Sequence, residues 1–538
     1  MKKFRYNNPI FIISAILFGI YIPTHIIILY TGAYTCDEGN YLYSSTLAIK
    51  GQIPYKDFAF WQPPAMLYVY GIISAVFGHS LTVARWFSFL FGFAALILMS
   101  LIVLKKGNKH SLILLLILMS LNLSYSFDTT NVKTQSLSIF IYTLALYCAV
   151  CGKSWKVKYI LSSLIMALSV GVRAAMLPAV VLFPFYLYFE SGRNKKYLKL
   201  SLAFVFGTML TGFALFYIMS DTKLMFGLWG FFKLTTTHVS VFEAWYLKEL
   251  IGNQLVCYSL FLGILTFLVY TVIADKAGKK SEILNSKSET NANAQNQKFQ
   301  TDSTRHSPLD PLKWISENPF ESYCLLAYLG ITLIHFTAPV KYPTHQTTNM
   351  PLMAMFIALT AGRFLEKTEI RKAAAGLIIL VMFSLGSLVF QVYPVDRSGG
   401  KFPLAEIKQI AESIKPYMGK NGKIFTFETI IAYEGGYELL SGLTIGVENH
   451  FGGFGMSTED CKKYKGVDNS IIKSYFENKE ADVLIMQQRE IHFIKRDKSG
   501  VSMDELMQTL HANYEKIVEF DKFGQFKQKT FCFAKKNR

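Results

Sequence analysis

Eleven apolar runs constrain this chain more than any other feature of its sequence. A helix needs about 20 mainly apolar residues to cross the hydrocarbon core of a bilayer. Several of the runs are shorter than that, so the sequence defines the number of spans only to within one or two. The sequence therefore predicts a mainly α-helical, polytopic membrane bundle of about eleven spans. The runs lie at residues 10–30, 81–104, 111–127, 136–152, 158–172, 174–189, 200–219, 252–274, 321–338, 351–365 and 373–393.

The distribution of charge gives the expected orientation of these spans. The chain has a formal net charge of +18, but from Pro394 onward it carries 22 basic and 20 acidic residues. Almost all of the excess therefore lies among the apolar runs, and basic residues beside membrane spans mark the cytoplasmic side. We expect a multi-pass protein of the plasma (inner) membrane with a cytoplasmic N-terminus. Nucleic-acid binding is disfavoured because the charge is a topology signal and not a basic surface.

The same charge rule decides two ambiguous stretches. Residues 64–78 are apolar, but a crossing there would place Lys105 and Lys106 outside, so this run is expected to be interfacial or re-entrant. Arg173 interrupts the apolar stretch 158–189, and reading that stretch as one span would reverse every later loop. We therefore expect Arg173 at an outer turn between two short helices.

Composition divides the chain into two domains. Residues 1–393 form the predicted membrane domain, with a first outer loop at 31–80 and a polar cytoplasmic linker at 276–318. Residues 394–538 have a soluble composition and are expected to form an extracytoplasmic α/β domain. Its predicted strands are 423–428, 482–486, 514–520 and 529–534, and its predicted helices are 404–414 and 503–510. Whether Cys461 and Cys532 pair is open.

The acidic pair Asp37-Glu38 follows the first span almost directly. Ionisable groups beside membrane spans are costly, so they are candidates for function. A carboxylate held at this depth among tyrosines could accept a proton from a hydroxyl nucleophile. The alternative is a solvated loop, or a helix whose N-cap is Asp37.

From these residues onward the sequence resembles a known family. It is similar to the GT-C type glycosyltransferases that use polyprenyl-phosphate sugars, a group that includes the protein O-mannosyltransferases and the lipid A aminoarabinose transferase (families 39 and 83). The closest similarity covers roughly residues 34–105. The matching residues are Asp37-Glu38 with Tyr41, residues 51–58, Pro63-Pro64 with Tyr68, residues 77–80, and Arg85.

This resemblance implies an enzyme and a site. Asp37 and Glu38 would be the catalytic acids, with Asp37 activating an acceptor hydroxyl. The donor would be a sugar on a polyprenyl phosphate, a lipid of the membrane. The acceptor would attack the anomeric carbon of this sugar and invert its configuration. The acceptor could be a glycan, a lipid or a protein. The residues expected along the substrate groove are Tyr41, Tyr55, Asp57, Pro63 and Pro64.

A leaving lipid phosphate needs fixed positive charge at the outer interface. The candidates are Arg85, Lys133, Arg173 and Lys341, each of which could instead be an interfacial residue that reaches to the lipid head groups. Arg173 is the strongest, because an unpaired cation inside an apolar stretch is costly. His345 stands roughly where the family often has a tyrosine, so it either binds the phosphate or simply lies at the interface.

A metal and a transporter function are the remaining open points. The resemblance implies a second acid in the next outer loop, where Asp128 stands, and carboxylates there could bind Mg²⁺ or Mn²⁺. No diagnostic ligand spacing accompanies them, so the sequence leaves a divalent metal open and makes no cofactor certain. The alternative function is a multi-span transporter or lipid flippase. It is less favoured because the acids gather at the outer boundary and the chain has no related halves.

Overall fold

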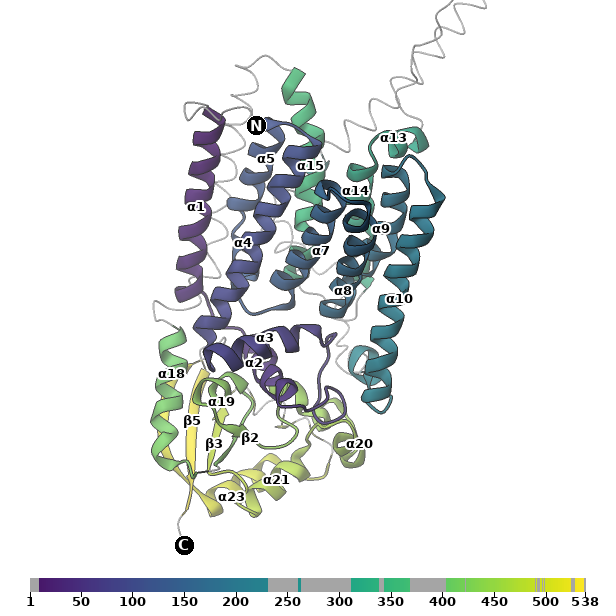
Figure 1. Cartoon of the computed structure of the whole chain (residues 1–538). Helices are drawn as coiled ribbons and strands as arrows, with labels where there is room; N and C mark the ends of the chain where they lie inside the picture. The colour runs from purple at the N-terminus through teal and green to yellow at the C-terminus, as the bar shows by residue number, and fades with distance from the viewer. Residues whose placement is uncertain are drawn as a thin grey trace, which may run out of the picture.

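The computed structural model describes residues 9–230, 260–262, 311–337, 343–367, 403–420, 422–488, 490, 494–495, 497, 499–523 and 528–536. Long helices form a bundle, and an α/β layer covers one end of it (Figure 1). The first helix enters the bundle near the end opposite that layer, and the C-terminus lies at the far side of the layer.

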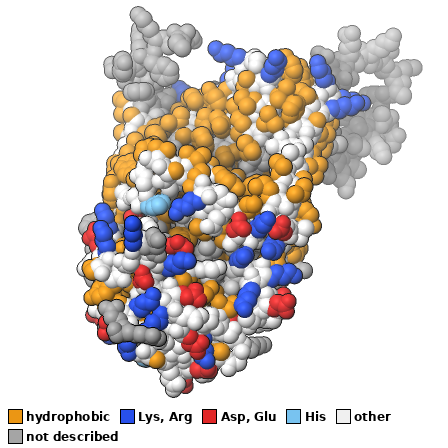
Figure 2. Space-filling model, turned by 60° about the horizontal axis from the view of Figure 1, so that its bottom comes forward, with side chains coloured by type: hydrophobic (Ala, Val, Ile, Leu, Met, Phe, Trp, Pro, Cys, Tyr) orange, Lys and Arg blue, Asp and Glu red, His pale blue; other side chains and the backbone are white. Residues whose placement is uncertain are grey.

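The bundle consists of the predicted apolar runs. Nine of the eleven runs fall on described residues and all nine are helical, whereas most of 252–274 and all of 373–393 lie outside the described residues. Among the described residues, five helices, α1, α4, α7, α10 and α14, are long and apolar enough to cross a membrane. Their side chains give the bundle an apolar surface, while mixed charges cover the α/β layer (Figure 2). The protein is a multi-pass membrane protein. The helices are α1 (Pro9–Thr31), α4 (Leu81–Lys106), α5 (Lys109–Ser120), α6 (Leu123–Thr130), α7 (Thr134–Cys151), α8 (Ser162–Val172), α9 (Leu177–Glu190), α10 (Lys195–Met219), α14 (Pro319–Thr337) and α15 (Met350–Lys367).

One of the runs and one longer apolar stretch are broken. The run 111–127, predicted as one span, becomes α5 and α6, which meet at an angle of 71°. The break follows from Asn122, whose side chain caps α6 by accepting a hydrogen bond from the backbone N–H of Tyr125 at 2.8 Å. The stretch 158–189 breaks at Arg173 as predicted, since Arg173 is extended between α8 and the short turn η2 (Ala174–Met176) before α9.

Two helices of the first loop, α2 (Cys36–Ile49) and α3 (Ala65–Phe77), lie between the bundle and the α/β layer (Figure 1). They pack closely, because a side chain at Gly71 would come within 2.7 Å of the carbonyl oxygen of Ser45. The apolar run 64–78 therefore forms a helix of only 13 residues. This is too short to cross a bilayer of ordinary thickness, which needs about 20 residues.

The α/β layer contains a five-stranded sheet with the order β2-β1-β3-β5-β4. β1 is parallel to β2 and β3, whereas β5 is antiparallel to β3 and β4. The four predicted strands and both predicted helices are present, and β2 is an additional, unpredicted strand of two residues. Cys461 and Cys532 are both free. The strands are β1 (Lys423–Thr426), β2 (Glu438–Leu439), β3 (Val483–Gln487), β4 (Tyr514–Phe523) and β5 (Gln528–Lys535). The main helices are α18 (Pro403–Ile414), α19 (Thr429–Gly435), α21 (Asn469–Glu477) and α23 (Met503–Asn513).

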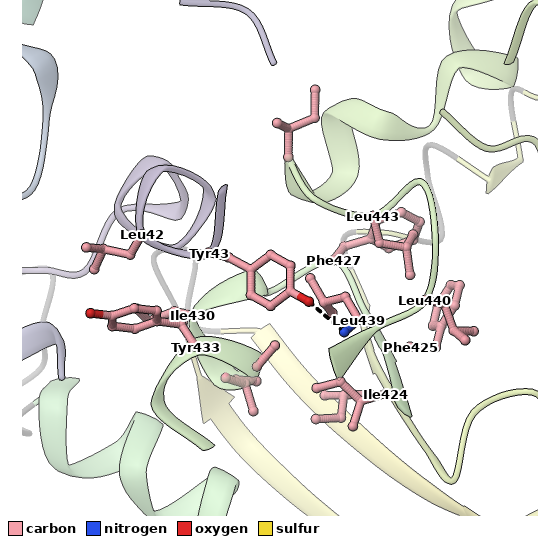
Figure 3. Packing of buried hydrophobic residues seen from close by; sticks show 14 of the residues in the cluster. Leu42, Tyr43, Ile424, Phe425, Phe427, Ile430, Tyr433, Leu439, Leu440 and Leu443 are labelled. Atoms are coloured by element: carbon pink, nitrogen blue, oxygen red, sulfur yellow. Dashed lines mark hydrogen bonds between the residues drawn. The ribbon is translucent and has the colours of Figure 1, made fainter. Parts of the chain in front are cut away.

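One hydrophobic core joins the first loop to the α/β layer. Leu42 and Tyr43 of α2 belong to the same buried cluster as Ile430 of α19 and Leu440 (Figure 3). The backbone N–H of Leu439 donates a hydrogen bond to the hydroxyl of Tyr43 at 2.8 Å. The helix that carries the acidic pair, α2, therefore shares a hydrophobic core with the α/β layer, and this core holds the two together.

Candidate active site

The acidic pair stands at the start of α2, and its two members face different surroundings. Thr35 has the extended backbone of an N-cap residue, so the alternative in which Asp37 caps the helix is wrong. Glu38 is fully buried and accepts hydrogen bonds from the backbone N–H groups of Thr35 and Val132, each at 3.1 Å. It also accepts two from Arg85, at 2.8 and 2.7 Å. Four hydrogen bonds satisfy this carboxylate within the chain.

Arg85 is fully buried and all of its N–H groups are used. Two bind Glu38, and the remaining three donate to the carbonyl oxygens of Leu29, Gly32 and Ala33 at 3.0, 3.2 and 3.4 Å. A guanidinium has five N–H donors, so none is left for a phosphate. This geometry contradicts the prediction that Arg85 binds the donor phosphate, and it does not fit a catalytic role for Glu38. The pair instead ties α4 to the start of α2 and so positions the neighbouring Asp37.

Asp37 is half-buried and lies within a cluster of charged groups. Burial raises the pKa of Asp37 above its usual range, and the charges of Glu38 and Asp128 act in the same direction. The positive charges of Lys133 and Arg173 oppose this rise. No described cation pairs with Asp37 within 4.0 Å. A carboxylate with a raised pKa and no direct ion pair is well suited to accept a proton.

Asp128 of α6 holds two groups in place. One carboxylate oxygen pairs with the ammonium of Lys133 at 3.1 Å, and the other accepts a hydrogen bond from the hydroxyl of Thr347 at 2.6 Å. Burial alone would lower the pKa of Lys133, but the carboxylates of Asp128 and Asp37 raise it above its ordinary value. Lys133 is therefore charged, and it points its ammonium toward the acids of the site.

Arg173 is buried without an acidic partner. Its side chain is 7% exposed, and one terminal nitrogen donates to the hydroxyl of Thr134 at 2.7 Å. Its Nε makes no hydrogen bond to any described residue, and no described carboxylate lies within 4.0 Å of it. The more distant charges that act on Arg173 include those of Asp128 and Asp37. A buried cation without a counter-ion is costly, so this site is suited to an anionic ligand.

His345 lies in a short helical turn, η4 (Pro343–Thr348), close to the same cations. Burial lowers the pKa of His345 well below its usual value, and the charges of Arg173, His335 and Lys133 lower it further. The imidazole is thus neutral at the edge of the cluster. Lys341, the fourth predicted phosphate ligand, lies outside the described residues.

The fold is similar to that of solved structures. No family model and no curated protein matches the sequence. The chain superposes on the crystal structure of ArnT from Cupriavidus metallidurans bound to undecaprenyl phosphate with a TM-score of 0.59. The match covers 98% of each chain at 11% sequence identity. The apo form of the same transferase matches at 0.57, with 12% identity over 96% of this chain and 97% of that one. The chain has the GT-C fold.

A third similarity is weaker. The oligosaccharyltransferase of Archaeoglobus fulgidus, solved with zinc and sulfate, matches at a TM-score of 0.47 and 11% identity. The match covers 98% of this chain and 73% of that one, and at this TM-score it supports no further conclusion.

On this GT-C fold, the predicted groove residues separate into two places. Tyr41 lies beside Asp37 and Arg173, and its ring packs 6.1 Å from that of Phe60. Tyr55 lies farther away, in a pocket between the first loop and the α/β layer, and its hydroxyl donates to the carbonyl of Gln62. Asp57 is in an exposed turn, where it accepts a hydrogen bond from the N–H of Ile53 at 2.7 Å. Pro63 and Pro64 are buried at the start of α3.

A divalent metal does not fit the described part of this GT-C site. No group of three or more His, Cys, Asp or Glu side chains there could hold a metal ion. The oxygens of Glu38 and Asp128 are already taken by Arg85, Lys133, Thr347 and backbone N–H groups, which leaves Asp37 alone. An Mg²⁺ or Mn²⁺ ion would need further oxygen ligands, but the other charged groups near Asp37 include the cations Lys133 and Arg173.

Three residues of this GT-C site are not among those predicted from the sequence, and two of them carry no clear signal in it. Thr134 and Thr347 are ordinary residues next to spans, and only the fold brings them to Arg173 and Asp128. His335 is different, because it lies inside a predicted span and has a ring centroid 5.4 Å from that of His345. A histidine in an apolar run is a recognisable signal.

Proposed function

We propose that this protein is a membrane glycosyltransferase that moves a sugar from a polyprenyl phosphate to an acceptor hydroxyl. The observation that carries the proposal is the meeting of Asp37 with the two buried cations, Lys133 and Arg173, at the end of the bundle beneath the α/β layer. A proton acceptor next to buried cations that can bind an anion is what transfer from a phosphate donor requires. The precedent with the same fold was crystallised with undecaprenyl phosphate, which supports a lipid-linked donor.

In the proposed reaction, Asp37 takes the proton of the acceptor hydroxyl as its oxygen bonds to the anomeric carbon of the sugar. The bond between that carbon and the phosphate oxygen breaks on the opposite face, so the configuration inverts. Its electron pair stays on the lipid phosphate, whose growing charge Arg173 and Lys133 neutralise. Asp128 orients Lys133 for this task, and the Glu38–Arg85 pair holds the start of α2 in place.

The proposal includes an orientation and a division of the chain. α4 ends at Lys106 and α5 begins at Lys109, so these basic residues lie at the end of the bundle away from the α/β layer. By the positive-inside rule that end is cytoplasmic. The site and the α/β domain of residues 394–538 would then be extracytoplasmic, and residues 1–393 would form the membrane domain of an inner-membrane enzyme. The acceptor, whether a glycan, a lipid or a protein, would approach between them.

The first prediction concerns Asp37. Asp37→Asn removes the proton acceptor with little change in shape, so transfer should fall by about 100-fold or more. The measurement is transfer from a panel of labelled polyprenyl-phosphate sugars in proteoliposomes, with envelope glycans compared by mass spectrometry. Asp221→Asn is the matched control, because the side chain of Asp221 is 56% exposed and its ion-pair partner among the described residues is the exposed Lys56. Wild-type transfer by Asp37→Asn would overturn the proposed function.

A further inference from the structure

Several buried polar atoms on α14 and η4 have no hydrogen-bond partner among the described residues, and α14 packs against the turn that follows Arg173. His335 is 3% exposed, and neither of its ring nitrogens makes a hydrogen bond of good geometry to a described residue. Gln346 is fully buried, and its Nε2 has no described partner either. The charge of Arg173 acts on His335, and the side chain of Gln346 lies close enough to interact with that imidazole.

The orientation of the Gln346 amide is fixed by its neighbours. Its Oε1 accepts hydrogen bonds from the Nδ2 of Asn349 at 2.8 Å and from the hydroxyl of Thr332 at 3.4 Å. Nδ2 of Asn349 also donates to Thr332 at 2.7 Å. Because Oε1 is occupied in this way, the unused part of Gln346 is its NH₂ group. Gln346 therefore offers donors and no acceptor to the space beside His335.

Groups of this kind indicate a ligand. A buried polar atom without a partner costs about 1–3 kcal/mol, so native proteins rarely leave several of them together. The unused groups are the Nε–H of Arg173, the NH₂ of Gln346 and the imidazole of His335, which carries one N–H when neutral. One of these groups is a cation, and among the described residues no carboxylate pairs with it. A ligand that these groups can bind is thus an anion with several acceptor oxygens.

We propose that His335 and Gln346 extend the Arg173 site so that it binds a phosphate monoester, the form in which the lipid carrier is released. This inference rests on the proposed function. Transfer breaks the bond between the anomeric carbon and the phosphate oxygen, and the acceptor proton goes to Asp37. The former bridging oxygen keeps the electron pair and becomes a third terminal oxygen with a second negative charge. His335 and Gln346 supply the extra hydrogen bonds that this oxygen needs.

The test compares ligands that differ only at the phosphate. Full-length protein in nanodiscs is titrated with undecaprenyl phosphate, undecaprenyl methyl phosphate, undecaprenol and inorganic phosphate, and bound ligand is measured by native mass spectrometry. His335→Phe keeps a ring but removes both nitrogens, whereas His335→Gln keeps an N–H donor. His110→Phe is the matched control, because His110 lies in the first turn of α5 at the opposite end of the bundle. Thermal unfolding of each variant reports on folding.

In His335→Phe, the affinity for undecaprenyl phosphate should fall about tenfold or more. The affinities for the methyl diester and for undecaprenol should change much less. His335→Gln should recover most of the loss, and His110→Phe should bind like the wild type. A merely structural role of His335 would weaken all three lipids alike, and this result would overturn the inference.

Three other results also decide the matter. If Arg173→Ala loses undecaprenyl phosphate but His335→Phe does not, the inference fails and the proposed function stands, with an ordered water beside His335. If neither the wild type nor Arg173→Ala prefers the phosphate to undecaprenol, the proposed function fails as well. If inorganic phosphate competes as strongly per mole as the lipid, the site serves free phosphate and the assignment to the lipid carrier is overturned.

Discussion

At the scale of single residues, the site separates charges that hold the fold from charges that are free to act. Glu38 and Arg85 satisfy each other almost completely, and removing either partner would leave a buried charge uncompensated. Asp37 and Arg173 have no such partner among the described residues. Neighbouring acids in one dipeptide thus have different tasks, because Glu38 faces α4 and Asp37 faces the cations.

The electrostatics of Asp37 predict a pH dependence. As the proton acceptor, Asp37 must be ionised, so the rate falls as the pH drops through its pKa, which burial has raised. Lys133 opposes this rise, and Lys133→Gln should therefore move the acid limb of the pH–kcat profile to higher pH. The loss of Lys133 also leaves the charge of Asp128 uncompensated, which acts in the same direction. Lys56→Gln, at an exposed lysine, should leave the limb in place. An unchanged or lower limb in Lys133→Gln would contradict the role given to these charges.

At the scale of elements, the position of α2 depends on close helix packing. A Cβ at Gly39 would lie 2.5 Å from the backbone nitrogen of Ile430 and 2.6 Å from the hydroxyl oxygen of Thr429. The α19 helix can approach α2 this closely only because Gly39 has no side chain. The hydroxyl of Thr429 also donates to Asn40 at 2.9 Å, so the contact is polar as well as tight.

Gly39→Ala should consequently push α19 away from α2. Overpacking of this kind costs about 1–3 kcal/mol, so the variant should unfold at lower temperature and transfer more slowly. The matched control is Gly19→Ala in α1, where a Cβ would meet no atom within 4 Å. Thermal unfolding in detergent and transfer in proteoliposomes check both effects. Equal stability of Gly39→Ala and Gly19→Ala would show that the α2–α19 contact is looser than described.

Elements and site differ in how far the sequence predicts them. Hydropathy is enough for the helices, and short apolar runs typical of buried strands are enough for β1 and β3, because both signals depend on nearby residues. The break at Asn122 is missed, since one capping side chain adds little against a long apolar run. The partner of Arg85 is missed because Glu38 lies 47 residues earlier in the chain. The sequence identifies Asp37 and Arg173 as costly charges, but only the fold shows which charges are neutralised.

At the scale of the whole molecule, the proposed orientation makes a direct prediction. α7 begins beside the site, just after Lys133, and its 18 residues carry the chain about 27 Å to the other end of the bundle. Cysteine introduced at exposed Lys153, just beyond that end, should react with a membrane-impermeant thiol reagent only after the cells are permeabilised. Cysteine introduced at exposed Glu477 of the α/β layer should react in intact cells. Labelling is compared with that of the unaltered chain, which has its own cysteines. The reverse labelling pattern would contradict the proposed topology.

The short helices on either side of Arg173 have a consequence for the surrounding lipid. The apolar helical stretch Ala174–Glu190 is about 26 Å long at 1.5 Å per residue, whereas the hydrocarbon slab is about 30 Å thick. A bilayer meets such a mismatch by thinning, with its head groups drawn inward next to the protein. We therefore expect the guanidinium of Arg173 to lie at the level of those head groups. A lipid phosphate can then reach Arg173 by lateral diffusion, and its charge does not have to enter the hydrocarbon core.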